Sequence, residues 1–505
     1  MVFPGRLSTG CYVCRRRKVK CDGARPACRR CIAQQRECTG YPDTFAFRPY
    51  KSTGAGEALP RKAESKRKPK KSAATTGQLT RSSSPPTAIT PCLEWQSLCY
   101  FFHQHVLHTH RSPCEGHLAF LPELYQERGT DPCLRNAILS VSYLSLFNAS
   151  RMDELYVNAR KHYGAALKGL TQALSNDEAS TLDETFAAAL FLSMFIDLSG
   201  EIQGAVNPHL PGICSLMHLR GRPQRSSKYA RKLFGWAFTQ VQIQAVASNQ
   251  FSYACLPPSI SMAFNPDYVL RSGLITSMIS EFCQSVSEFA RIELDQTPQA
   301  CARMLHSLLS RSSGALDQIN IWDEALPPHW KDQYSVPTLD SPVRDPWTTC
   351  FLAVVQAAQI SFYQHVLWCC DRYELVKDAI DDIHLAMLPM DTLRGLQGRI
   401  GDLISVICNT VNSTLGHITP HNEFQVHQNS KMANGYTLLW PMWVIYNCSF
   451  VTQEHHDLCR RALECIGSTM GCRLASVLCM EEVPTGFPTM PSIAQPALGS
   501  VVAVQ

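Results

Sequence analysis

Six cysteines near the N-terminus repeat one spacing twice, and this repeat constrains the chain more than any other feature. The pattern C-x2-C-x6-C occurs twice with six residues between the copies, and its members are Cys11, Cys14, Cys21, Cys28, Cys31 and Cys38. A structural zinc ion takes four ligands, so two ions need eight ligand positions. Six thiolates are enough only when two of them bridge both ions. The repeat therefore predicts one binuclear cluster that holds two zinc ions per chain.

A dense run of cations lies between the second and third cysteines. It consists of Arg15, Arg16, Arg17, Lys18 and Lys20. Two zinc ions and six thiolates together carry a net charge of about −2, so the cluster itself offsets only part of this positive charge. The surplus, to which Arg29 and Arg30 add, predicts a partner rich in phosphate.

The N-terminal segment resembles the fungal zinc binuclear cluster (Zn2Cys6) family of DNA-binding transcription factors, through the string CYVCRRRKVKCDGARPACRRCIAQQREC. The resemblance implies a short helix in each half and a pseudo-twofold axis between the halves. It implies that the first cysteine of each half bridges both ions and that the others complete one ion per half: Cys11 and Cys28 bridge, Cys14 and Cys21 complete one zinc, and Cys31 and Cys38 complete the other. Lys18 occupies the position that, in relatives, reaches the guanines of a CGG-type triplet.

The chemistry of the cations agrees with a role in DNA recognition. Lysine or arginine donating to guanine O6 and N7 is the commonest specific base contact, which makes Lys18 and Arg17 the candidate base readers. The remaining cations are expected to contact phosphates, which adds affinity without sequence information. These are Arg15, Arg16, Lys20, Arg29 and Arg30.

Six cysteines also suit a disulfide-rich secreted module, or a zinc module that binds protein or RNA. Residues 1–30 contain many cations and no apolar run of signal-peptide length, which argues against secretion. The other 17 of the 23 cysteines show no second zinc spacing and are expected to be reduced thiols in a nuclear or cytosolic protein. A zinc module that contacts protein or RNA stays open as an alternative.

Charge and composition divide the chain into four predicted parts: a Zn2Cys6 DNA-binding domain over 1–45, a disordered basic linker over 46–92, a helical regulatory domain over 93–480 and a disordered tail over 481–505. Residues 1–71 hold 19 Lys and Arg against 5 Asp and Glu, a net charge of +14. Because the whole chain carries +5, the rest carries −9. The run from Arg61 to Lys71 is a nuclear-import signal, a second electrostatic contact with DNA or a solvated run of charges. The first two are compatible, and we favour import, which predicts a nuclear location. No apolar heptads follow the cluster, so a homodimer would lack an evident coiled coil.

Beyond Cys92 the apolar residues recur with a period of about 3.6, which predicts an all-α fold class for the large C-terminal region. Trp95, Leu98, Phe102 and Val106 mark one expected helix face. Thr181 and Glu184 predict a capping box at the start of an apolar helix that continues through Leu198. The apolar stretches 186–198 and 436–451 are expected to be buried helices rather than membrane spans.

Several helical segments also resemble the fungal-specific regulatory domain that accompanies this zinc cluster. They include DPCLRNAILSVSYLSLF, DETFAAALFLSMF and LLWPMWVIYN, and the resemblance covers roughly residues 93–480. It implies that the helical domain controls the DNA-binding module through effectors, through the transcription machinery or co-regulators, or through self-association.

Two clusters outside the cysteines contain groups that bind metals in other proteins. Among His103, His105, His108 and His110, helical spacing puts only His105 and His108 on one face. The motif D-x-x-D-D at 378–382 has no acidic counterpart downstream and is explained by a solvated helix face. No phosphate loop, nucleophile elbow or H-E-x-x-H motif occurs, so no enzyme activity is expected.

The sequence thus predicts a nuclear, sequence-specific transcription factor of RNA polymerase II type. We expect it to bind double-stranded DNA at CGG-like triplets and to regulate metabolic or specialised-metabolite genes, with no membrane partner. The alternative is a chromatin-tethered co-regulator or ligand sensor whose zinc cluster contacts protein rather than bases.

Overall fold

The computed structural model of the chain describes residues 11–24, 27–38, 91–109, 116–201, 207–220, 227–248, 268–293, 296–331, 345–377 and 390–479. These residues belong to two compact units, Met1–Pro85 and Pro86–Gln505. The predicted linker over 46–92, including the basic run 61–71, lies outside the described residues except for its last two positions, and so does the tail over 481–505. The acidic motif at 378–382 lies outside them as well.

The N-terminal unit contains two one-turn helices, one in each cysteine repeat. Helix α1 (Tyr12–Arg16) and helix α2 (Arg29–Ala33) each begin directly after the first cysteine of a repeat. Helices of five residues are too short to be stable alone in water. Their small core consists mainly of cysteine side chains with Val13, so the sulfur cluster holds this unit together.

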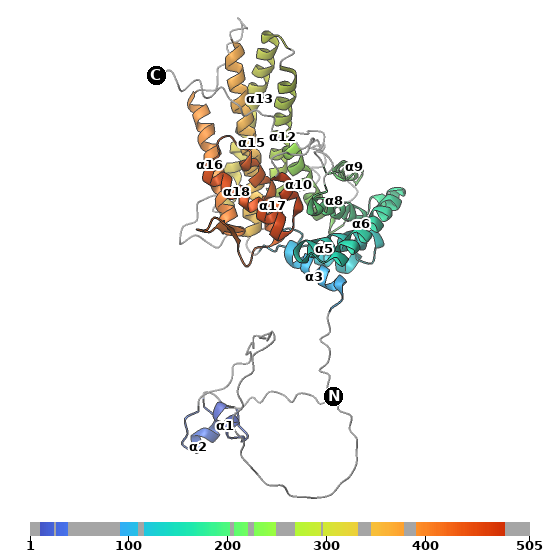
Figure 1. The fold of residues 1–505 in the computed structure, drawn as a ribbon, viewed down its shortest axis with the longest axis vertical. Helices are drawn as coiled ribbons and strands as arrows, with labels where there is room; N and C mark the ends of the chain where they lie inside the picture. Colours follow the sequence, from blue (N-terminus) through green and yellow to red (C-terminus); the bar gives the residue numbers. More distant parts are fainter. Residues whose placement is uncertain are drawn as a thin grey trace. The chain divides into compact units, whose positions relative to one another are not determined.

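The C-terminal unit is helical, as the sequence predicts (Figure 1). Its longer helices are α3 (Leu93–His105), α4 (Leu121–Arg128), α5 (Pro132–Ser150), α6 (Asp153–Leu174), α8 (Asp183–Ser199), α9 (Leu210–Arg220), α10 (Ala230–Ser248), α12 (Tyr268–Ile292), α13 (Pro298–Ala325), α15 (Pro346–Val376), α16 (Met390–Thr414), α17 (Met432–Tyr446) and α18 (Gln453–Cys465). Shorter pieces are α7 (Asp177–Ser180), α14 (Pro328–Lys331), the π-helix η5 (Ile466–Met470) and α19 (Arg473–Leu478).

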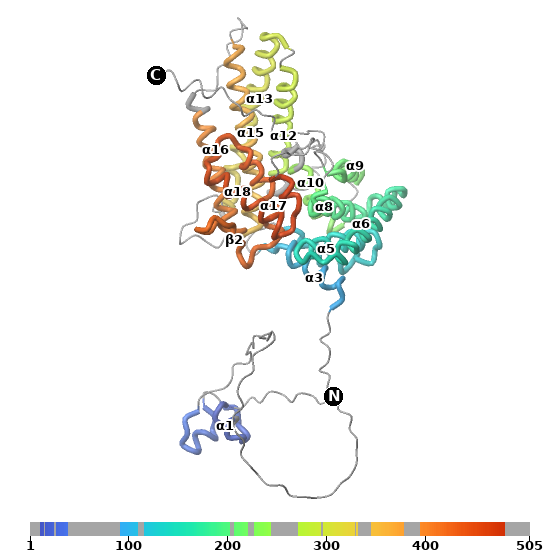
Figure 2. The backbone as a smooth tube through the Cα atoms, in the orientation of Figure 1, coloured from blue at the N-terminus to red at the C-terminus, as the bar shows by residue number. Residues whose placement is uncertain are grey.

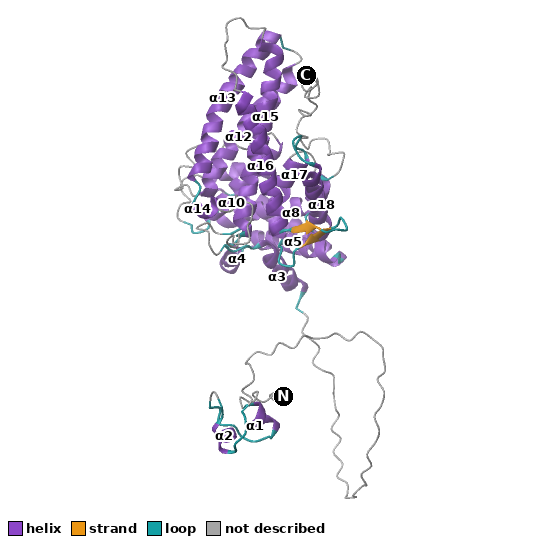
Figure 3. Ribbon diagram, turned by 90° about the vertical axis from the view of Figure 1, so that its left-hand side faces the viewer, coloured by secondary structure: helices purple, strands orange, loops and turns teal. Residues whose placement is uncertain are grey.

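One small hairpin interrupts this helical unit and was not expected from the sequence. Strands β1 (Gly416–Ile418) and β2 (Phe424–Val426) pair antiparallel, with Gly416 opposite Val426 (Figure 3). A Cβ atom on Gly416 would approach the carbonyl oxygen of Gln425 to 2.1 Å, so only glycine allows the strands to come this close.

Three long helices begin at a polar residue followed by proline, which explains where they start. The side chains of Asp131, Thr297 and Asp345 each accept a hydrogen bond from a backbone N–H three residues ahead, in α5, α13 and α15. The following proline needs no hydrogen-bond partner in the first turn. At α8 the predicted capping box is wrong, because Leu182 is the N-cap and the hydroxyl of Thr181 donates to the carbonyl of Glu178 instead.

Helix α15 lies at the centre of the C-terminal unit, where it contacts α12, α13, α16 and α17 (Figure 1). Among the described residues it is the one helix long and apolar enough to cross a membrane, but 89% of its apolar window is buried inside the unit. A helix that is buried to this extent belongs to the core of the unit. Helix α8 is buried along almost its whole length too, as predicted for residues 186–198.

Helices from the beginning and from the end of the C-terminal unit pack together (Figure 2). Helix α3 contacts α17, and α8 contacts α19. Asn148 on α5 joins these ends, since its side-chain amide donates to the carbonyls of Leu198 at 3.0 Å and Gly471 at 2.7 Å.

The buried face of α3 differs from the predicted one. Leu98 and Val106 are buried as expected, but Trp95 is 63% exposed. The other buried positions of α3 are Ser97, Phe101 and His105. Spacings of three and four residues from Leu98 lead to Phe101 and His105, so the face that meets α5 is rotated away from Trp95.

Candidate metal centre and nucleic-acid interface

The structure brings all six predicted zinc ligands together in two overlapping groups. One group is Cys11, Cys14, Cys21 and Cys28, and the other is Cys11, Cys28, Cys31 and Cys38. Within each group the sulfur atoms lie within 4.8 Å of one another. Cys11 and Cys28 belong to both groups, which is the arrangement that shared, bridging thiolates require.

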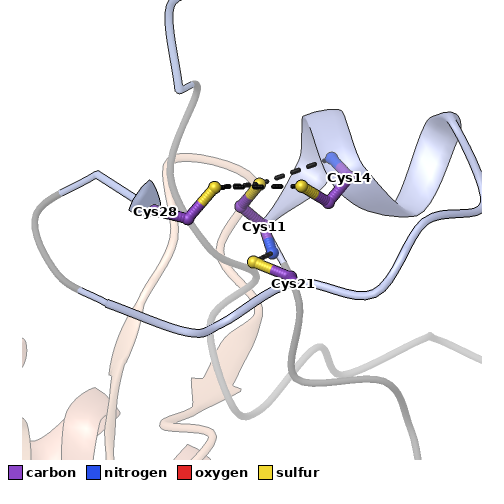
Figure 4. Close-up of side chains that lie close together, drawn as sticks. All are labelled: Cys11, Cys14, Cys21 and Cys28. Carbon is purple, nitrogen blue, oxygen red and sulfur yellow. Dashed lines mark hydrogen bonds between the residues drawn. The ribbon is translucent and has the colours of Figure 1, made fainter. Parts of the chain in front are cut away.

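The distances between sulfur atoms match the size of a zinc tetrahedron. Sγ of Cys11 lies 3.7 Å from Sγ of Cys28, and Sγ of Cys14 lies 3.8 Å from Sγ of Cys28 (Figure 4). Four sulfurs bonded to one zinc at about 2.3 Å stand about 3.8 Å apart. The donor set therefore fits zinc in both chemistry and spacing, and zinc bound there would cross-link the two halves of the module.

Backbone hydrogen bonds to sulfur repeat between the halves with an offset of 17 residues. The N–H of Cys14 donates to Sγ of Cys11 at 3.4 Å, and the N–H of Cys31 donates to Sγ of Cys28 at 3.3 Å. Such bonds help a sulfur atom to carry negative charge. The two halves are thus built alike around their first cysteines.

Each half also ends its helix in the same way. Lys18 and Gln35 have left-handed backbone conformations, with φ of 54° and 51°. The next N–H in each half bonds back to the second cysteine, from Val19 to the Cys14 carbonyl at 3.1 Å and from Arg36 to the Cys31 carbonyl at 2.9 Å. These are Schellman endings, and they place Lys18 immediately beyond α1 rather than on it.

Several thiols of the cluster have shifted pKa values. Burial and neighbouring thiols raise the pKa of Cys14 to about 12, and a bond with Cys28 together with burial raises that of Cys31. By contrast, hydrogen bonds from the backbone of Cys11 and Gly23 lower the pKa of Cys21 to about 7. Thiolates crowded in this way repel one another, and two Zn²⁺ ions held by these cysteines would supply the positive charge that favours the thiolate form.

The predicted DNA-contacting side chains that the structure describes are all exposed. They are Arg16, Arg17, Lys18, Lys20, Arg29 and Arg30, while the side chain of Arg15 lies outside the described part of the chain. Two of them have partners within the module: Nη1 of Arg17 donates to Oε1 of Gln34 at 2.5 Å, and Nη1 of Arg30 donates to the carbonyl of Lys20 at 3.2 Å. These two contacts join one half to the other.

The two halves differ sharply in charge although their backbones match. Residues 15–20 hold five cations and no acid, whereas the equivalent residues 32–37 hold one cation, Arg36, and one acid, Glu37. The position equivalent to Lys18 is the neutral Gln35. Arg29 and Arg30 lie in the second half, but the other predicted DNA-contacting cations, which are the majority, lie on the first.

No second metal site forms among the residues that the structure describes, where only the two cysteine groups gather three or more suitable ligands. His105 is buried against Phe101, with ring centroids 4.5 Å apart, and burial lowers its pKa to about 3. His103 and His108 are exposed, and His110 lies outside the described residues.

Comparison with known families accounts for both units. Residues 9–46 match the Fungal Zn(2)-Cys(6) binuclear cluster domain. Residues 98–483, about three quarters of the chain, match the Fungal specific transcription factor domain. The chain belongs to the fungal specific transcription factor family.

Curated relatives of this family match the chain over short stretches. The Transcriptional regulatory protein moc3 of Schizosaccharomyces pombe is 51% identical over 41 residues, which is 8% of each chain. The Aspercryptin biosynthesis cluster-specific transcription regulator atnN of Emericella nidulans is 57% identical over 37 residues, 7% of this chain and 6% of the relative. The chain thus aligns with less than a tenth of the length of these relatives. No solved structure matches the chain.

Family membership carries three consequences for this fungal transcription regulator. Its cluster domain binds two zinc ions, as the cysteine spacing predicted. Its family is one of transcription factors and not of enzymes, in agreement with the absence of catalytic motifs. DNA and the transcription machinery are the partners that membership of this family suggests.

Proposed function

We propose that this regulator reads a CGG-like triplet in double-stranded DNA through the first half of its zinc cluster, with Lys18 as the principal base reader. The proposal rests mainly on one observation, the position of Lys18 in a left-handed turn immediately beyond α1. That turn is anchored by the bond from Val19 to Cys14, a zinc ligand in the proposed cluster. The lysine is exposed, so its flexible side chain extends from a rigid base.

Lys18 is favoured over Arg17 as the base reader because Arg17 already bonds Gln34 in the other half. Its guanidinium helps to hold the halves together, and its remaining donors are suited to a phosphate. We assign Arg15, Arg16, Lys20, Arg29 and Arg30 to phosphate contacts, which set orientation and contribute the salt-dependent part of the affinity.

Zinc has a structural role in this proposal. Cys11 and Cys28 would bridge the two ions, Cys14 with Cys21 would complete one, and Cys31 with Cys38 would complete the other. The metal supplies the folding free energy of a module whose core contains little else. The side chains of the module, and not the metal, then recognise the DNA.

The proposed recognition of DNA also suggests where the protein acts and which genes it regulates. We propose that the protein acts in the nucleus as an RNA polymerase II-type factor and regulates metabolic or specialised-metabolite genes; one relative, atnN, is named as a cluster-specific regulator. The domain limits 1–45, 46–92, 93–480 and 481–505 are part of this proposal. Because one half carries most of the cations, a single module is suited to one triplet, and a homodimer would be needed to read two.

A library of randomised duplexes bound to the full-length protein tests the proposed base reader. Lys18→Ala should reduce the preference for the best triplet by about 1–3 kcal/mol. Arg16→Ala should weaken binding to all sequences alike and reduce the salt slope by about one unit. Gln35→Ala is the matched control, since it makes the same change at the same backbone conformation in the other half.

Two results would count against the proposal. Equal losses for Lys18→Ala across every sequence would remove Lys18 as a base reader. A flat sequence profile for the unaltered protein would favour a co-regulator whose cluster contacts protein.

A further inference from the structure

The side chains of Arg17 and Gln34 meet between the two halves of the zinc module. Nη1 of Arg17 donates to Oε1 of Gln34 at 2.5 Å. These residues are 17 positions apart, which is also the separation of Cys11 and Cys28, the first cysteines of the two repeats. Arg17 and Gln34 therefore occupy equivalent positions in the two halves. Equivalent residues can touch only where the halves adjoin, so the bond lies at the boundary about which the module repeats.

The two members of this pair differ in charge and in hydrogen-bonding capacity. The guanidinium of Arg17 has only donors, and the amide of Gln34 supplies an acceptor oxygen. Two arginines at these positions would repel each other. Glutamine at position 34 instead draws the cation of the first half toward the second half. The repeated backbone thus carries an unequal pair, and the bond runs in one direction only.

The backbones that carry the pair are anchored close to the proposed metal ligands. The N–H of Gln34, the C-cap of α2, donates to the carbonyl of Cys31 at 3.2 Å. The N–H of Arg17 donates to the carbonyl of Val13 in α1, also at 3.2 Å. Because both backbones are held in this way, the two side chains extend toward each other from fixed points.

Two further contacts hold α2 against the first half. Nη1 of Arg30 donates to the carbonyl of Lys20 at 3.2 Å, and the N–H of Arg29 donates to Oδ2 of Asp22 at 3.1 Å. Both acceptors lie in the segment that follows Lys18. These contacts fix where α2 stands relative to that segment, so they maintain the approach of its C-cap residue to the end of α1.

Arg17 is a potential competitor of its neighbour, Lys18. Lys18 is exposed in its left-handed turn, whereas the guanidinium of Arg17 is directed at the second half. An arginine fork can donate to guanine O6 and N7 at the same time, and its rigid, planar shape suits this contact better than a flexible ammonium does. Without its partner, Arg17 would therefore be able to contact a base beside the one that Lys18 contacts.

We infer that Gln34 is a positioning residue that determines sequence specificity. By accepting the hydrogen bond from Arg17, it keeps that guanidinium away from the base edges and leaves the recognition of guanine to Lys18. The inference rests on the proposed reading of DNA by the first half and deepens it, because it gives the second half a part in base recognition. The second half selects which of two adjacent cations reads the DNA.

The test measures the binding of full-length variants to a library of randomised duplexes and compares base preferences at each position rather than total affinity. Gln34→Ala releases Arg17 and should add a preference for guanine beside the base that Lys18 reads. The added preference should be about threefold to tenfold, which is the effect of one hydrogen bond of ordinary strength. Gln35→Ala is the matched control, because it removes the same exposed side chain one position further along, and it should leave every base preference within twofold.

A double-mutant cycle tests whether Gln34 acts through Arg17. In the Arg17→Ala background, Gln34→Ala should leave the base preferences within twofold of those of Arg17→Ala alone, because no guanidinium remains to be released. Gln34→Glu is the conservative variant, since its carboxylate accepts the same bond. It should keep the original base preferences, while its added negative charge lowers the affinity for every sequence alike. Two equivalents of zinc in each purified variant confirm that the module is folded.

Three outcomes would overturn the inference. Base preferences for Gln34→Ala that match those of the unaltered protein would do so, and so would a change of equal size with and without Arg17. A loss of affinity that is equal for all sequences would show that Gln34 only stabilises the module. Each of these outcomes leaves a sequence-dependent loss for Lys18→Ala unaffected, so a failure of this inference is distinguishable from a failure of the proposed base reader.

Discussion

A buried carboxyl group in α8 provides a quantitative test of the helical unit. Asp197 is held by Tyr436 and Asn207 deep within the unit, and burial raises the pKa of its carboxyl to about 6 in spite of these hydrogen bonds. The same group in an unfolded chain has a pKa of about 3.9. We consider its replacement by asparagine, which has the same shape, carries no charge and keeps one acceptor oxygen.

The direction and size of the effect follow from this shift. Because the pKa of Asp197 is raised in the folded state, its contribution to stability is fully present below about pH 4 and is lost as the pH rises through about 6. A difference of about two pKa units corresponds to about 3 kcal/mol. Asp197→Asn should therefore gain about 3 kcal/mol relative to the unaltered protein between pH 4 and pH 7.

Urea unfolding of the full-length protein, followed by near-ultraviolet circular dichroism at several pH values, measures this difference. Asp402→Asn, an exposed change on α16, is the control and should show no such trend. Unfolding free energies that stay parallel for the unaltered protein and Asp197→Asn from pH 4 to pH 7 would refute the reasoning. Asp197 would then be no more difficult to ionise in the folded state than in the unfolded one.

Two further predictions concern the two units separately. Removing zinc from the full-length protein with a chelator should release two equivalents of zinc, unfold α1 and α2 and allow trypsin to cleave within residues 15–20. The melting temperature of the helical unit should not change. An unaltered tryptic digest would contradict the structural role of the metal. Asn148→Ala should lower the unfolding free energy of the helical unit by about 2–4 kcal/mol, because the buried carbonyls of Leu198 and Gly471 lose their donor. A change in the urea midpoint equivalent to less than 0.5 kcal/mol, about the spread expected of a neutral surface substitution, would show that this link is dispensable.

The helix content and the positions of several helices could be predicted from residue patterns in the sequence. The period of 3.6 predicted a helical unit, and the apolar stretch 186–198 located α8. The Asp-Pro and Thr-Pro pairs before α5, α13 and α15 are start signals that could have located the beginnings of these helices. The capping box at Thr181 failed because a short helix, α7, ends there and uses the same threonine. Local rules of this kind cannot predict with which of two adjacent helices a polar side chain will form its hydrogen bond.

The cleft between α10, α15 and α17 could not have been predicted in the same way. Its walls come from His117, Trp236, Trp347 and Tyr436, which are ordinary apolar or aromatic positions when each is viewed along its own helix. Only the packing of α10, α15 and α17 against one another leaves a space between them. The hairpin at β1 and β2 escaped notice for a related reason, since three residues are too few to show an alternating pattern.

The cysteine spacing alone specified the metal centre, because a thiolate is a ligand wherever it lies, and the short intervals between the cysteines leave the backbone few ways to close around zinc. The tertiary structure decided which charges are available, because it paired Arg17 with Gln34 and left Lys18 exposed in a left-handed turn. It also brought tryptophans from distant helices to one cleft. The ability of a cysteine to bind metal depends on the residue type alone. Solvent exposure, hydrogen bonds between distant side chains and clefts arise only when distant segments of the chain pack together.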